Sequence, residues 1–219
     1  MLAAPTRQVQ IDVYFDLICP WCWIGKRHFE MARARLTKLI PDLHIDVRWH
    51  SVQLIPHVPP QGWSFQAFYE QRLGGPEAVR TRQAQVRAAA AGAGLTVHFE
   101  RIKTFPNTWL AHRLLALAAQ QLTPQALHAL QDALFEAYFV QGRDLGDSTT
   151  LNAMAETHGV DLSNAEQVDV PSVWGANSGA PGVPYFVFNQ QTALSGAQAP
   201  EVLLSAMLRS SELLLPSIT

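Results

Sequence analysis

The stretch YFDLICPWCWIGKRHFE, residues 14–30, constrains the fold of this chain more than any other, because it joins a strand pattern to a helix pattern. Apolar and polar residues alternate over residues 9–16, which is the period of a half-buried strand. After Pro20, apolar residues recur at steps of three and four until the next proline, which is the period of a helix with one buried face. A proline is favoured in the first helical turn, where its missing N–H breaks no hydrogen bond. The pattern predicts that Cys19 begins a helix at the end of a strand and that Cys22 follows one turn later, facing the core.

This position gives the two thiols different chemistry. Unpaired backbone N–H groups and the positive end of the helix dipole meet at the first residue of a helix. A thiolate is stabilised there, and thiol pKa values in such settings span about 3.5 to 7.5. We therefore expect Cys19 to be the exposed, attacking sulfur and Cys22 to be the buried sulfur that forms or resolves a disulfide with it. Pro20 and Trp21, which lie between them, are predicted to contact the substrate.

Other roles for a cysteine pair fit this sequence less well. A structural disulfide stabilises most when it closes a long loop, and this loop would hold two residues. A zinc site usually needs two such pairs, and the chain has only two cysteines. Haem attachment needs a histidine after the second cysteine, where this chain has Trp23. Two inert core cysteines remain an alternative, but the setting favours a redox-active dithiol, and we predict no metal site.

Composition excludes several classes of function. A chain of 219 residues with 48% hydrophobic and 16% charged residues can bury a sizeable core in one domain with an insertion, or in two small domains. A formal net charge of -2 without a basic stripe argues against a nucleic-acid partner. No apolar run approaches the roughly 20 residues that span a bilayer, so we predict no membrane partner. The first residues lack the pattern of a secretory signal, so we expect a cytoplasmic protein, whose thiols stay mostly reduced.

The next part of the chain predicts a second strand and then a long helical block. The strand is expected at residues 44–52, where Ile45, Val47 and Trp49 alternate with polar residues. Prolines and a glycine then interrupt regular structure, and the pattern from about residue 63 to 175 is helical. The helix boundaries that we expect in this block are a start at Pro76, a stop at Gly92, N-caps at Asn107 and Thr123, and a stop at Gly159.

Strand character returns near the C-terminus. GVPYFVFN, residues 182–189, is aromatic and β-branched, TALSGAQ follows as an edge strand or a turn, and Pro200 opens a last helix through Leu208. Without the helical block, the order of elements is that of a thioredoxin-like α/β fold. A block of ~110 residues is too structured to be a loop. We therefore predict a thioredoxin-like domain, residues 1–60 and 176–219, with a helical subdomain, residues 61–175, inserted after the second strand.

Four stretches of the sequence resemble the DsbA-type branch of the thioredoxin fold, and within it the FrnE-like oxidoreductases. The matching stretches are DLICPWCWIGKRHFE, NTWLAHRLLALA, LFEAYFVQGRDLGD and GVPYFVFNQQTALSGAQ, which span nearly the whole chain in order. The resemblance implies that Pro184 is a cis-proline facing the dithiol, with the Val183 backbone turned toward Cys19, where it can pair with a substrate peptide. It also implies substrate-binding positions at Asn107 and His112.

The same superfamily contains kappa-class glutathione transferases and 2-hydroxychromene-2-carboxylate isomerases, which are similar in NTWLAHR and SGAQ. Those relatives typically carry serine near the first cysteine position and bind glutathione, whereas this chain retains both cysteines. Three functions follow. The first is a thiol–disulfide oxidoreductase acting on protein or low-molecular-weight disulfides. The second is a glutathione-dependent isomerase or transferase, with glutathione as a co-substrate, and the third is a non-catalytic redox-sensing interaction protein. We predict no other cofactor, a disulfide-containing protein or a small thiol as the partner, and a monomer or homodimer.

A few further residues allow two interpretations each. Asp16, three residues before Cys19, is interpreted as a solvated strand end, with proton relay to the resolving thiol as the alternative. His112 either lines the cleft opposite the dithiol or is a satisfied core or surface histidine. Trp23 and Trp109, together with the tryptophan between the cysteines, either form an apolar rim for a ligand or fill the core, and we favour the core.

Overall fold

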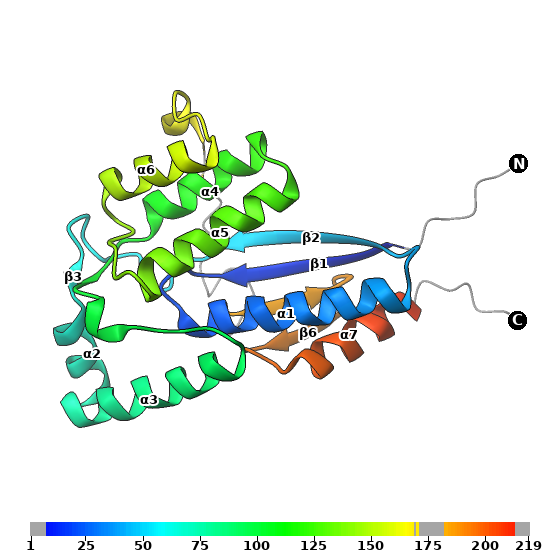
Figure 1. Ribbon diagram of the computed structural model, residues 1–219, viewed down its shortest axis with the longest axis horizontal. Helices are drawn as coiled ribbons and strands as arrows, with labels where there is room; N and C mark the ends of the chain where they lie inside the picture. The colour runs from blue at the N-terminus through cyan, green and yellow to red at the C-terminus, as the bar shows by residue number, and fades with distance from the viewer. Residues whose placement is uncertain (1–7, 169, 171–181, 213–219) are drawn as a thin grey trace, which may run out of the picture.

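The cysteine pair follows the first strand of a four-stranded sheet whose strand order is β2-β1-β5-β6 (Figure 1). Strands β1 (Gln8–Phe15) and β2 (His44–Ser51) run parallel, and β5 (Tyr185–Phe188) and β6 (Thr192–Ser195) continue the sheet antiparallel to their neighbours. This is the predicted thioredoxin-like arrangement, with β6 as the edge strand. The computed structural model describes residues 8–168, 170 and 182–212, so the predicted domain boundary at residues 175–176 lies outside the described residues.

Two helices pack side by side on one face of the sheet (Figure 1). Helix α1 (Pro20–Leu39) begins and ends as the sequence predicts, and α7 (Pro200–Glu212) runs four residues past the expected end. The core between these helices and the sheet consists of fully buried apolar side chains. They are Val9, Ile11 and Val13 from β1, Phe29, Ala32 and Leu36 from α1, Phe186 and Phe188 from β5, and Leu203, Ala206 and Met207 from α7.

The segment between β2 and β5 is helical in its described residues, as predicted. Its elements are α2 (Phe65–Leu73), α3 (Pro76–Gly92), α4 (Trp109–Gln121), α5 (Pro124–Phe139) and α6 (Ser148–His158), with short 3-10 turns at Phe99–Arg101 and Ala165–Gln167. The sequence pattern missed one feature. Strands β3 (Trp63–Ser64) and β4 (Thr104–Phe105) pair antiparallel, and two residues are too few to show an alternating pattern.

The predicted helix boundaries in this segment hold with one exception. Helix α3 starts and stops as expected, Thr123 caps α5, and Gly159 ends α6 in the left-handed conformation. The N-cap of α4, however, is Thr108 and not Asn107. The Asn107 Oδ1 accepts a hydrogen bond from the Trp109 N–H at 3.0 Å, so its side chain closes a turn one residue before the helix.

The helical segment packs directly onto the N-terminal half of α1. The indole of Trp23 is stacked on the rings of Phe135 and Phe139 in α5, with centroids 6.1 and 5.8 Å apart, and both cysteines belong to the same apolar cluster. The dithiol therefore lies where the sheet, α1 and the helical segment meet. Among the described residues, no helix is both long and apolar enough to cross a membrane.

Candidate active site

Cys19 and Cys22 are free thiols at the start of α1. Cys19 is the N-cap residue, with extended backbone angles, and its carbonyl accepts hydrogen bonds from the N–H groups of Cys22 and Trp23. The helix start predicted for Cys19 is confirmed. The expectation that its sulfur is exposed is wrong, because both cysteines are buried. Cys19 is 8% exposed and Cys22 is 2% exposed, so Cys19 is only the more accessible of the two.

The backbone of Val183 covers the first thiol. The Sγ of Cys19 lies 3.7 Å from the Val183 carbonyl oxygen, to which its S–H donates, and the Val183–Pro184 bond is cis, as the resemblance implies. Pro184 in turn lies against α1 at Gly25: a Cβ placed on that glycine would be only 2.8 Å from the proline Cγ. A glycine at this position of α1 is thus what lets the segment before β5 approach the cysteine pair.

The environment of Cys22 opposes its ionisation. Burial raises the pKa of the Cys22 thiol well above its usual value, and the hydrogen bond and charge of Cys19 raise it further. The negative charge of Asp16 acts in the same direction, while a hydrogen bond from the Asp16 backbone opposes part of the shift. Cys22 therefore needs a proton acceptor close by before it can attack a disulfide.

The interpretation of Asp16 as a solvated strand end is wrong. Its side chain is 0% exposed. One carboxylate oxygen accepts from the Leu54 N–H at 2.8 Å, and the other lies 3.1 Å from Nε2 of His112. Asp16 is thus a fully buried carboxylate with two hydrogen-bond partners, and its charge raises the pKa of the Cys22 thiol.

His112 does not line an open cleft, because its ring is 0% exposed and packs edge-on against Phe15. Its Nδ1 is buried without a hydrogen-bond partner among the described residues. Because a carboxylate oxygen only accepts, the Nε2–H of His112 is the donor in its hydrogen bond to Asp16.

The other predicted site residues lie in three different settings. Pro20 and Trp21 are half-buried in the first turn of α1. Trp23 belongs to the core, and Trp109 is 39% exposed beneath the guanidinium of Arg113, so the tryptophans form no common rim. Asn107 joins the start of α4 to the segment after β2. Its Nδ2 donates to the Val58 carbonyl at 2.6 Å, and its Oδ1 accepts from Gln53 Nε2 at 2.8 Å.

A cavity of about 720 Å³, lined by both apolar and polar side chains, opens beside the loop after β2. Its lining includes Leu54, whose backbone N–H binds Asp16, and Phe68. The ring of Tyr69 is 5.1 Å from that of Phe68, and burial followed by the charge of Cys19 raises the pKa of Tyr69. Sequence reasoning missed this cavity, because its walls come from α2, β3 and the loop after β2, which only the fold brings together.

One cluster has the composition of a metal site but the geometry of an ion-pair network. The ligand atoms of Glu30, His128 and Asp132 lie within 4.8 Å of one another. The buried ammonium of Lys26 lies between them, at 2.5 Å from Glu30, 2.6 Å from Asp132 and 3.1 Å from His128 Nε2. An ammonium in the central position supplies the charge that a cation would supply, so these residues join α1 to α5.

The chain is similar in sequence and in fold to several known proteins. The family profile of the DSBA-like thioredoxin domain matches residues 10–171. The protein YwbO of Bacillus subtilis is 27% identical over 153 residues, which cover 70% of this chain and 68% of YwbO. The crystal structure of SCO1869 from Streptomyces coelicolor, described as a probable DsbA oxidoreductase, superposes with a TM-score of 0.81 at 26% identity, covering 96% of this chain and 93% of that one. The cytosolic disulfide reductase DsbM from Pseudomonas aeruginosa, solved with GSH, shares the fold with a TM-score of 0.54 at 18% identity, covering 94% and 96% of the two chains.

Proposed function

Because this chain belongs to the DSBA-like thioredoxin domain family, we propose that it is a thiol–disulfide oxidoreductase whose Cys19–Cys22 dithiol reacts with disulfides of proteins or small molecules. The observation that carries the proposal is the arrangement of three groups around the start of α1. Cys19 is the N-cap residue of the helix and its sulfur faces the Val183 carbonyl, Cys22 is buried one turn behind it, and the charge of the Asp16 carboxylate acts on Cys22.

In the proposed reaction, the Cys19 thiolate attacks one sulfur of a substrate disulfide. The substrate S–S bond breaks, a mixed disulfide with Cys19 forms, and the first substrate sulfur leaves as a thiolate that takes a proton from water. Cys22 then transfers its proton to the carboxylate of Asp16 and attacks the Cys19 sulfur. The mixed disulfide breaks, the second substrate sulfur leaves, and the Cys19–Cys22 disulfide remains. Two electrons have passed from the protein to the substrate, and the reverse sequence oxidises a dithiol.

We assign roles in substrate binding to the Val183 backbone and to the cavity beside the loop after β2. An extended substrate segment beside Cys19 can exchange backbone hydrogen bonds with residue 183, as strands do at a sheet edge. Apolar side chains of a protein substrate fit the cavity lined by Leu54 and Phe68, which lies on the Asp16 side of the dithiol. Pro20 and Trp21, half-buried in the same turn as Cys19, complete the contact surface in this proposal.

We further propose that a small thiol such as glutathione returns the oxidised protein to the dithiol form. Two glutathione molecules would be oxidised to glutathione disulfide for each Cys19–Cys22 disulfide reduced, which balances the electrons. The structure of DsbM with GSH, a cytosolic reductase of the same fold, supports this choice of reductant and a cytoplasmic location for this chain. Size-exclusion chromatography decides between the proposed monomer and homodimer.

The test is a reductase assay with insulin and, separately, with glutathione disulfide. We expect the wild type to reduce at least one of them, Cys19→Ser to be inactive, and Cys22→Ser to accumulate mixed disulfides that release on addition of dithiothreitol. Activity that survives Cys22→Ser and depends on added glutathione would instead identify a glutathione-dependent isomerase or transferase. Thiols that both stay alkylatable after oxidation would contradict the proposal.

A further inference from the structure

A separate cavity of about 490 Å³ lies over β2, between α1 and α5. This volume is within the range of about 300–1,000 Å³ that is usual for small-molecule sites. Neither cysteine lines the cavity, and neither does the Val183–Pro184 segment. It therefore belongs to another part of the surface than the candidate active site, beside the edge strand β2.

The floor of this cavity is apolar surface that the fold leaves uncovered. Ile45, Val47 and Trp49 pair with Val9, Ile11 and Val13 of β1, so the two sets of side chains share one face of the sheet. The β1 set is at most 1% exposed, whereas all three β2 residues are only half-buried. Helices cover this face fully over β1 and only in part over β2. An apolar ligand that covered it would gain about 25 cal/mol for each Å² removed from water.

The wall formed by α5 holds a polar group without a partner. Gln131 is 2% exposed, its side chain lines the cavity, and its Oε1 accepts no hydrogen bond among the described residues. A buried carbonyl oxygen left without a donor costs about 1–3 kcal/mol. The oxygen itself is buried, so the Gln131 side chain must turn toward the cavity before a ligand N–H group can donate to it.

The charges around the cavity favour a carboxylate. The guanidinium of Arg33 lines it from α1 and forms no ion pair with any residue that the structure describes. The acidic group in the lining, Asp46, is paired with Arg48 at 2.9 Å. Of the two histidines in the lining, His44 is exposed, and His128 belongs to the ion-pair network with Lys26. Arg33 is thus the cation available to a ligand, and a guanidinium binds a carboxylate through two parallel hydrogen bonds.

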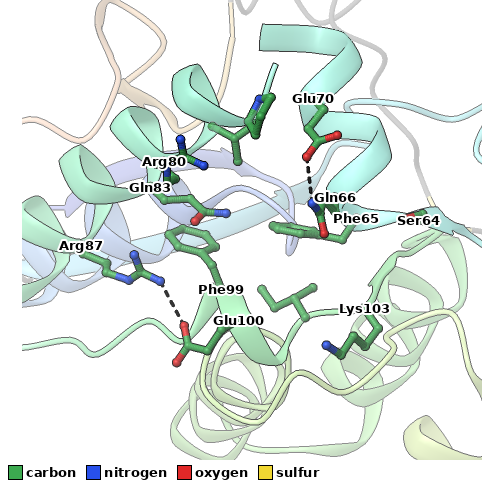
Figure 2. Close-up of a pocket in the computed structure, with 13 residues that line it drawn as sticks. Ser64, Phe65, Gln66, Glu70, Arg80, Gln83, Arg87, Phe99, Glu100 and Lys103 are labelled. Carbon is green, nitrogen blue, oxygen red and sulfur yellow. Dashed lines mark hydrogen bonds and ion pairs between the residues drawn. The ribbon is translucent and has the colours of Figure 1, made fainter. Parts of the chain in front are cut away.

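A second pocket is lined by polar and charged side chains, several of which have partners within the protein. The pocket of about 320 Å³ between α2, α3 and the turn after α3 is also lined by charged side chains, and two pairs of its lining residues are hydrogen-bonded or ion-paired (Figure 2). Arg87 pairs with Glu100 at 3.0 Å, and Gln66 donates to Glu70 at 2.8 Å. These pairs satisfy one another without a ligand, which the groups around Arg33 and Gln131 do not.

We propose that the cavity over β2 binds a small molecule with three features: an aromatic or branched apolar body on the β2 floor, a carboxylate at Arg33 and an N–H donor at Gln131. An N-acylated aromatic or branched amino acid carries all three. The three contacts come from β2, α1 and α5, so binding also connects the active-site helix to the helical segment.

The test is calorimetric titration of the full chain with N-acetylphenylalanine and with N-acetylphenylalaninamide, which lacks the carboxylate. We expect the acid to bind the wild type about tenfold more tightly than the amide, and Arg33→Gln to weaken the acid about tenfold without affecting the amide. Gln131→Leu weakens both probes about tenfold, because it removes the acceptor of their shared N–H group. The matched control is Arg35→Gln on the same helix, since Arg35 pairs with Glu201 and does not line the cavity. That variant binds as the wild type does.

Thermal unfolding separates a lost contact from a damaged fold. Gln131→Leu removes an unpartnered buried oxygen, so its melting temperature equals or exceeds that of the wild type. No binding of N-acetylphenylalanine to the wild type would overturn the proposal. Equal weakening by Arg33→Gln and Arg35→Gln would overturn it too, because general surface charge would then explain the affinity.

Discussion

Replacing Gly25 by alanine tests how the cysteine pair and the segment before β5 are held together. The added Cβ would lie 2.8 Å from Pro184 Cγ, 3.4 Å from Pro184 Cβ and 3.5 Å from Ala197 Cα. Carbon atoms in contact prefer about 3.5–4.0 Å, so the proline ring must retreat by roughly 0.7 Å or more. The ring is closed on the backbone nitrogen, so beyond a change of ring pucker it moves only together with the backbone. Its movement carries the Val183 carbonyl away from the Cys19 sulfur.

Two opposing effects determine the stability of Gly25→Ala. Overpacking a buried contact costs about 1–3 kcal/mol, whereas alanine in a helix interior is favoured over glycine by about 1 kcal/mol. The net loss is therefore about 0–2 kcal/mol, small enough for the variant to fold. Activity should fall further than stability, since a displacement approaching 1 Å at a reacting group can cost up to about a hundredfold in rate. We expect a loss of about tenfold or more in the rate of disulfide reduction.

The assay compares disulfide reduction and thermal unfolding in Gly25→Ala and in the matched control Gly92→Ala. Gly92 is also helical, but an added Cβ there meets no atom within 4 Å. The control should keep full activity and equal or exceed the wild type in stability. If the two variants behaved alike in both measurements, the contact between Pro184 and α1 would not position the dithiol, and the reasoning would be refuted.

Three other predictions concern ionisable groups. In single-cysteine variants, Cys19 should be alkylated faster than Cys22 at neutral pH, because burial raises the pKa of Cys22; faster reaction of Cys22 would contradict this. Asp16→Asn removes a negative charge that raises the Cys22 pKa, so alkylation of Cys22 should shift to lower pH; an unchanged profile would exclude Asp16 as its partner. Burial raises the pKa of Glu30, but hydrogen bonds and charge from His128 and Lys26 outweigh it and lower the value from 4.5 to about 2. This depressed pKa stabilises the fold above pH 4.5, and the stabilisation is lost as the pH falls toward 2. Urea titrations should therefore show Glu30→Gln to be roughly 2–3 kcal/mol less stable at neutral pH and less sensitive to acid below pH 4.5; equal slopes would contradict the network.

The sequence by itself determined where most strands and helices begin and end, because these boundaries depend on interactions between residues a few positions apart. Alternation before the cysteines predicts β1, a proline after Cys19 predicts the start of α1, and Thr123 and Gly159 mark helix ends. Each of these signals depends on the conformation and hydrogen bonds of neighbouring residues. The order of these elements predicts the thioredoxin-like fold, and the resemblance to the DsbA-type proteins added the cis Pro184 beside the dithiol, which no local pattern shows.

The tertiary structure decided what surrounds the dithiol. Asp16 looked like a solvated strand end, yet its partners Leu54 and His112 lie 38 and 96 residues away and bury it completely. The Cys19 sulfur is covered by a carbonyl 164 residues further along the chain. Whether a polar side chain is buried depends on which distant segments pack on it, because burial is tolerated only where those segments supply hydrogen-bond partners. The spacing of residues near a site carries no information about those segments, so the cysteines could be found in the sequence and the acid beside them could only be placed by the fold.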